Sequence, residues 1–188
     1  MAVIEYDPPE RFVVGTVGPP GQRQFYLQAT SGRRQTTVSI EKTQVGILAD
    51  RINDLLDAFG GAAGSDAAAA ALVDNGPLDM PVTEEFKVGT MALAWDSERS
   101  RVVVECHAMG DSYDSPSVLE ELEAGVEIDP ADDPTQLVLR VILHGGTARA
   151  FARRGSAVVA AGRPPCPFCA GPLDSEGHIC PRANGYRR

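Results

Sequence analysis

The stretch "RFVVGT", residues 11–16, returns later in the chain as "EFKVGT", residues 85–90, with Phe, Val, Gly and Thr in the same places. After each copy the sequence shows three strand-like segments and then a helical one. The strands are expected at 12–17, 23–30 and 35–41 and at 86–95, 101–108 and 135–144, with helices at 43–59 and 147–161. This order predicts an α+β fold of two βββα-like units, an internal duplication that forms a mixed or antiparallel sheet with packed helices. The alternative is that the four matched residues recur by chance.

Both expected helices have an apolar stripe at helical spacing. The first stripe consists of Val45, Leu48, Ile52, Leu55, Leu56 and Phe59. The second helix offers Ala148, Phe151, Val158 and Val159 for burial. We expect both stripes to be buried.

Composition divides the chain into four parts. The first unit is expected at 1–60, the second at 85–162, and a separate tail at 163–188. Residues 61–84 are rich in Ala and Gly and poor in large apolar side chains, so we expect a mobile linker. Residues 110–134 are rich in acids and contain no Lys or Arg. They are expected to form an insertion exposed to solvent, or alternatively a docking surface for a basic partner.

The bulk properties are those of a globular protein without a leader or a membrane span. The chain has 188 residues, 43% of them hydrophobic, and a formal net charge of −9. Acids and prolines interrupt the first thirty residues, where a signal peptide would need a basic start and an apolar run. A cytoplasmic location is therefore expected. The negative charge opposes nucleic-acid binding unless a local surface is basic.

The tail "PPCPFCAGPLDSEGHICPRANGYRR", residues 164–188, has the pattern of a metal site. Cys166 and Cys169 have the close spacing of a zinc knuckle, and His178 and Cys180 complete a set of four ligands. Three thiolates and one imidazole leave no open position, so the expected Zn²⁺ is structural. The alternative is a reduced, metal-free and redox-labile tail. Nucleic-acid contact is a further candidate role for the tail's arginines, which are Arg182, Arg187 and Arg188.

The two strand-to-helix junctions are candidate sites for an anionic ligand, because a helix N-terminus offers free backbone N–H groups. The candidate residues are Lys42, Thr43, His144, Gly145, Gly146 and Thr147. If the units pack symmetrically, Glu41 and Lys42 would approach His144. The alternative is that the two glycines make a turn and Thr147 caps the helix.

Catalytic patterns do not stand out in the sequence. Cys106 and His107 are adjacent on an expected strand, so their side chains point to opposite faces and cannot form a nucleophile–base pair. Cys106 is expected to be a buried structural thiol. No catalytic residue is assigned, and whether the protein is an enzyme stays open, with a non-catalytic role favoured.

Three stretches resemble a known family: "DPPERFVVGTVGPPGQRQFYLQA", "EFKVGTMALAWD" and "VVAAGRPPCPFCAGPLDSEGHICPRANGYRR". They are similar to an actinobacterial family of conserved hypothetical proteins, classed as a domain of unknown function. The resemblance implies no assigned reaction. Its members tend to be encoded beside a kinase-like protein, a histidine-phosphatase-like phosphomutase and a mycothiol-pathway ligase. It therefore implies a protein partner, with the kinase-like and phosphomutase-like proteins as candidates.

The closed ligand set and the acidic insertion favour a non-catalytic zinc-binding protein that acts as a partner-binding or adaptor module. Two alternatives are kept. One is an enzyme or sensor that binds an anionic metabolite, phosphorylated or thiol-containing, at the strand–helix junctions. The other is a nucleic-acid-binding protein that uses the arginine-bearing tail.

Overall fold

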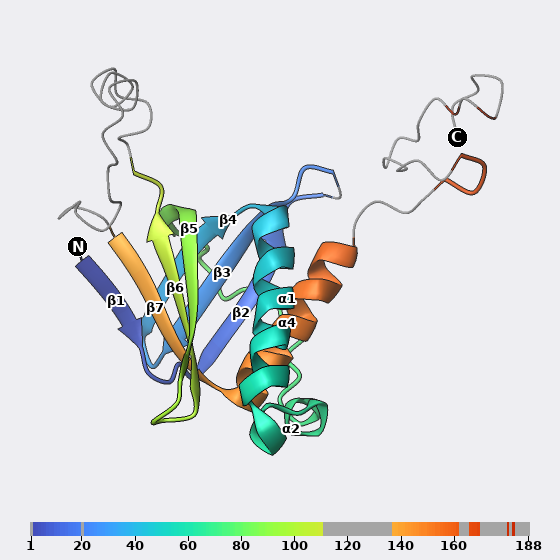
Figure 1. The fold of residues 1–188 in the computed structure, drawn as a ribbon. Helices are drawn as coiled ribbons and strands as arrows, with labels where there is room; N and C mark the ends of the chain where they lie inside the picture. The colour runs from blue at the N-terminus through green and yellow to red at the C-terminus, as the bar shows by residue number, and fades with distance from the viewer. Residues whose placement is uncertain are drawn as a thin grey trace, which may run out of the picture.

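A computed structural model describes residues 2–19, 21–110, 137–161, 166–169, 180 and 182. The described body contains a seven-stranded mixed sheet in the order β1-β7-β6-β5-β4-β3-β2. Helices α1 and α4 lie side by side against it (Figure 1). The expected mixed α+β architecture is confirmed.

Two antiparallel meanders make up most of the sheet, and each leads into a helix. The first contains β2 (Arg11–Val17), β3 (Gln24–Ser31), β4 (Arg34–Ile40) and α1 (Lys42–Phe59). The second contains β5 (Glu84–Asp96), β6 (Arg101–Ala108), β7 (Leu137–His144) and α4 (Gly145–Ala160). Strands β4 and β5 pair in parallel and join the meanders into one sheet.

A further strand, β1 (Ala2–Tyr6), pairs in parallel with β7 and was not predicted. It has only five residues, and the adjacent apolar residues Val3 and Ile4 interrupt the alternation that identifies a strand. Ile4 packs against the core, whereas Val3 is 42% exposed.

The sheet curves so strongly that β1 reaches β4, although β7, β6 and β5 lie between them in the strand order. Tyr6 Oη and Thr36 Oγ1 share a hydrogen bond of 3.0 Å. The Arg34 guanidinium lies 4.4 Å from the centre of the Tyr6 ring and donates to the Glu5 carbonyl. These contacts join β1 to β4 across the concave side of the curve.

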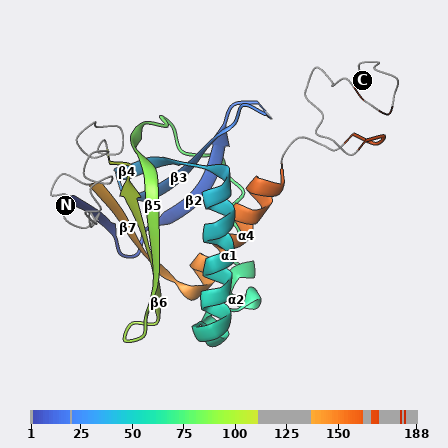
Figure 2. The same ribbon diagram turned by 45° about the horizontal axis from the view of Figure 1, so that its top comes forward.

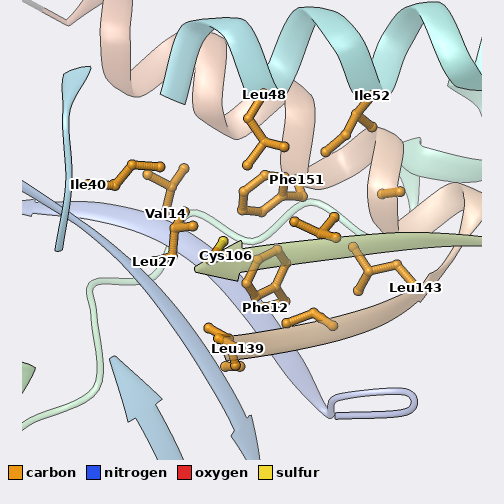
Figure 3. Close-up of a cluster of buried hydrophobic side chains, with 14 of the residues drawn as sticks. Phe12, Val14, Leu27, Ile40, Leu48, Ile52, Cys106, Leu139, Leu143 and Phe151 are labelled. Carbon is orange, nitrogen blue, oxygen red and sulfur yellow. The ribbon is translucent and has the colours of Figure 1, made fainter. Parts of the chain in front are cut away.

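The main core lies between the curved sheet and the two helices (Figure 3). Helix α1 buries Val45, Leu48, Ile52 and Leu56, as its stripe predicted. Phe59 is an exception, because it is 61% exposed and stacks on Trp95 with ring centres 6.3 Å apart. The stripe was therefore wrong at its last position, where the helix runs beyond the core.

Helix α4 packs on β2, which lies at the opposite end of the strand order from β7. The rings of Phe12 and Phe151 stack with their centres 4.5 Å apart. The helix also runs antiparallel to α1: Arg149 binds Asp57, while Gly155 lies so near Ala49 that an added Cβ would be 3.3 Å from the alanine Cβ. Small residues at this crossing let the two backbones approach closely.

The linker contains η1 (Gly61–Gly64) and α2 (Asp66–Ala70), which lie at the end of α1 and against α4 (Figure 2). Its remainder crosses the far face of the sheet, where Leu78 packs against Val13 and Tyr26. A Cβ at Gly15 would lie 2.6 Å from Leu78 Cγ, so glycine makes room for this contact. The linker is thus packed against both meanders, which differs from the expected mobile connection.

Asp74 joins the linker to both meanders. Its carboxylate accepts hydrogen bonds from Arg11 Nε on β2 at 2.6 Å, from Arg154 Nη1 on α4 at 3.1 Å and from the Gly76 N–H at 2.8 Å. The Arg11 hydrogen bond is the main reason that the pKa of Asp74 is lowered from 3.8 to about 2. Arg154 also donates to the carbonyl of Val14, at the open edge of β2.

We expect Asp74→Asn to lower the free energy of unfolding by about 2 kcal/mol at pH 7, because it removes the carboxylate that two half-buried guanidinium groups share, although Asp79 stays 3.0 Å from Arg11. A carboxylate whose pKa is lowered in the folded state contributes stability above its unfolded pKa and loses it as the pH falls. With a pKa of 3.8 unfolded and about 2 folded, that loss occurs between these two values. Urea denaturation at pH 7, 4 and 2.5 measures both effects.

The matched control is Asp54→Asn, because this side chain is 72% exposed and its ion pair with Arg51 is long, at 3.9 Å. This substitution should lower the free energy of unfolding by less than about 0.5 kcal/mol. For Asp74→Asn, the difference from wild type should shrink by about 1 kcal/mol on acidification, after allowance for the 36% exposure of the carboxylate. A difference that is constant with pH would contradict the assignment.

Candidate metal centre

Three thiols of the tail lie close together. The Sγ atoms of Cys166, Cys169 and Cys180 are all within 4.8 Å of one another, and those of Cys166 and Cys180 are 3.8 Å apart. Cys166 and Cys180 are buried, whereas Cys169 is half-buried. The fourth expected ligand, His178, lies outside the described residues.

A tight turn at residues 167–169 places the first two thiols. The Phe168 N–H donates to Cys166 Sγ at 3.5 Å, and Arg182 donates to the Phe168 carbonyl at 3.3 Å. Burial opposes ionisation of Cys166, but hydrogen bonds from the backbone N–H groups of Cys169 and Phe168 favour its thiolate, and its pKa is lowered. The turn therefore presents a sulfur that is prepared to act as a metal ligand.

The spacing of the sulfur atoms fits a tetrahedral metal site. Zinc–sulfur bonds of about 2.3 Å in a tetrahedron place two sulfur atoms about 3.8 Å apart. This is the separation of Cys166 and Cys180. It is far longer than a disulfide bond of about 2.05 Å, so these two cysteines are not joined by a disulfide. The three cysteines can hold a metal ion.

The start of α1 is occupied by its own chain. Glu41 and Gln44 form a reciprocal capping box, in which each side chain accepts a backbone N–H of the other residue. Lys42 and Thr43 are exposed beside this cap. Glu41 also pairs with Lys87 at 2.8 Å.

The start of α4 is covered by η1 and α2. A Cβ at Gly145 would lie 3.0 Å from the Ala63 carbonyl oxygen, and one at Gly146 would lie 3.2 Å from Leu72 Cδ1. Both glycines are buried, and they allow the linker to pack on the helix end. The expected cap by Thr147 is wrong, because α4 begins at Gly145 and its N-cap residue is the exposed His144.

The structure does not bring the two junctions together. Helices α1 and α4 are antiparallel, so Lys42 and Thr43 lie at one end of the pair and His144 to Thr147 at the other. An α-helix rises 1.5 Å per residue, so the 18 residues of α1 span about 27 Å. The expected approach of Glu41 and Lys42 to His144 is therefore wrong.

Cys106 is fully buried in the core, and burial, with a smaller effect of the Glu105 charge, raises its pKa to about 12. His107 faces the other side of the strand, with Nε2 3.6 Å from Glu105. Glu105 in turn binds Arg140 at 2.6 Å, and Arg140 binds Glu5 at 3.3 Å. Sequence reasoning missed this polar row across β6, β7 and β1, because only the strand register reveals that the residues are neighbours.

The remaining candidates lie largely beyond the described ranges. Arg182 is exposed, whereas Arg187 and Arg188 lie outside the described residues. The same holds for the acidic insertion after Gly110. Among the residues that are described, no helix has the length and apolar character needed to cross a membrane.

Fold and site together define an α+β protein with a C-terminal group of three cysteines that can bind a metal ion. The chain belongs to the family described as "Protein of unknown function (DUF3090)", whose model matches residues 4–180. The expected membership of a family of unknown function is thereby confirmed. No curated protein and no solved structure shows a significant match to the chain.

We expect the purified protein to contain about one metal ion per chain, and Cys166→Ser or Cys180→Ser to lose it, because each removes a buried sulfur ligand. Elemental analysis of protein purified without added metal measures this. The matched control is Cys106→Ser, which removes a thiol from the core and should leave the metal content unchanged. Equal metal content in wild type and all three variants would contradict the site.

Proposed function

We propose that this protein is a non-catalytic, zinc-bound partner-binding protein, in which the C-terminal site is structural. The observation that supports the metal half of the proposal is the grouping of Cys166, Cys169 and Cys180 within 4.8 Å. Thiolates favour Zn²⁺ among the common divalent ions, and His178 would complete a Cys₃His set. Four protein ligands would leave no position for water or substrate, so the ion would stabilise the tail and would not take part in a reaction.

The partner half of the proposal is supported by an apolar surface beside α1. We define the α1–β5 surface as Leu55, Phe59, Met91, Leu93 and Trp95. Four of these side chains are partly buried and pack against the core, and Phe59 is 61% exposed and stacks on Trp95. Aromatic side chains grouped in this way are typical of protein interfaces.

Charge indicates what kind of partner would fit. Asp54 and Asp96 directly adjoin Leu55 and Trp95 in the chain, and the whole protein has a net charge of −9. Negative charge favours a partner segment with basic and apolar side chains. Members of the family that the chain resembles tend to be encoded beside a kinase-like and a phosphomutase-like protein. We propose that one of these two proteins is the partner.

We also propose that the two meanders arose by duplication. Phe12 and Phe86 occupy the same position of the repeated motif and are both buried, and so are Val14 and Val88. The glycines that follow each allow a close contact, Gly15 with Leu78 and Gly89 with the Met109 backbone. A superposition of β2 to α1 on β5 to α4 that failed to align these pairs would contradict a common origin.

Cobalt substitution tests the number and kind of ligands. In the Co²⁺ protein, the sulfur-to-metal charge-transfer absorption should correspond to three thiolates, with ligand-field bands typical of a tetrahedral ion. His178→Cys should raise the absorption by about a third, because a fourth thiolate replaces the imidazole. Octahedral bands would instead indicate open positions and contradict a closed structural site.

Trp95 is the only tryptophan in the chain and lies in the α1–β5 surface, so its fluorescence reports on binding there. We expect its emission to change when the kinase-like or phosphomutase-like protein is added. Phe59→Asp should weaken binding at least about tenfold, because it places a charge in the apolar centre.

Met80→Asp is the matched control, because Met80 is 79% exposed but lies on the linker, outside this surface. It should bind as wild type does. Equal affinities for wild type and Phe59→Asp, or the absence of binding to both candidate partners, would count against the proposal.

A further inference from the structure

The cysteines of the chain differ in how easily solvent reaches them. Cys169 is half-buried, whereas Cys166 and Cys180 are 3% and 0% exposed. Cys106 is 0% exposed and lies in the core between the sheet and the helices (Figure 3). A small reagent in solution would therefore meet Cys169 before any of the other three.

We propose that Cys169 is a site of oxidation by hydroperoxides, and that Cys166 then joins it in a disulfide that releases the bound metal. This inference rests on the proposed metal site and adds a modification to it. Both sulfur atoms belong to the group that lies within 4.8 Å, so a small local movement brings them to the bonding distance of about 2.05 Å.

The chemistry has two steps and needs only a hydroperoxide as oxidant. In the first step the Cys169 sulfur attacks the terminal oxygen, the O–O bond breaks, and a sulfenic acid forms while hydroxide or alkoxide leaves. In the second step the Cys166 thiolate attacks the Cys169 sulfur, the S–S bond forms and hydroxide leaves. The leaving groups take up protons from water. The two cysteines together lose two electrons, which reduce the hydroperoxide.

Chain connectivity favours Cys166 over Cys180 as the second thiol. Cys166 and Cys169 are joined through the turn at 167–169, so they stay close together when the metal leaves. Cys180 is 14 residues from Cys166 in sequence, so a disulfide between these two would have to close a longer loop. A disulfide removes two of the sulfur ligands, so the remaining groups bind the metal much more weakly.

The experiment uses the full-length, zinc-loaded protein with hydrogen peroxide as the probe. A chromogenic chelator measures zinc release, and mass spectrometry after thiol alkylation in denaturant identifies the disulfide. We expect one zinc per chain to be released together with formation of a Cys166–Cys169 disulfide, while Cys106 remains a free thiol. Dithiothreitol with added zinc should restore the loaded protein.

The matched variant is Cys169→His, which keeps a zinc ligand at this position but removes the sulfur. Its zinc release by peroxide should be at least about tenfold slower than in wild type, because a different, buried thiol must react first. Cys106→Ser should behave as wild type does.

The inference would be overturned if peroxide released zinc from Cys169→His at the wild-type rate. It would also be overturned if the disulfide in the oxidised wild-type protein did not include Cys169. Disulfide mapping of the wild-type protein tests the inference even if the variant does not fold. If the reduced protein contains no zinc, the proposed function fails separately, and the mapped disulfide still decides whether Cys169 and Cys166 are the reactive pair.

Discussion

The packing of α4 on β2 is the contact on which the rest of the fold depends. The helix directly follows β7, yet Phe151 stacks on Phe12 from the strand at the far end of the sheet order. This contact is possible only because the sheet is curved, and it encloses the core between the helices and the strands. The buried side chains of both meanders that face the helices therefore belong to one cluster, and we expect the two meanders to unfold together. The linker also joins β2 to α4 from outside the core, because Asp74 accepts hydrogen bonds from an arginine on β2 and from an arginine on α4.

Local sequence pattern was sufficient for the elements that repeat. The apolar run from Phe12 to Val14 and the stripe from Val45 to Leu56 predicted a strand and a helix that the structure contains. Pattern was not sufficient where a residue's role depends on a distant neighbour. Gly145 and Gly146 resembled an anion-binding turn, but glycine is needed there because η1 and α2 pack so closely that a larger side chain would not fit. The folded position of Asp74 also could not be predicted, because both of its arginines are distant in sequence.

The candidate site was predictable to the extent that its ligands are close in sequence. Cys166 and Cys169 are separated by one turn, and the knuckle spacing identified both of them. The grouping of Cys180 with them followed from the chemistry of the residues and is seen in the structure. The difference in exposure among the three thiols was not predictable, since it depends on how the turn is covered.

The pairing of β1 with β7 has a consequence for synthesis on the ribosome. Ala2 lies opposite Leu137 in the sheet, so β1 has no strand with which to form its backbone hydrogen bonds until β7 has been translated. Such long-range pairings form late, since a large loop must close before they stabilise the chain. Residues 2–6 would therefore wait in the nascent chain while the first meander and α1 already have local partners.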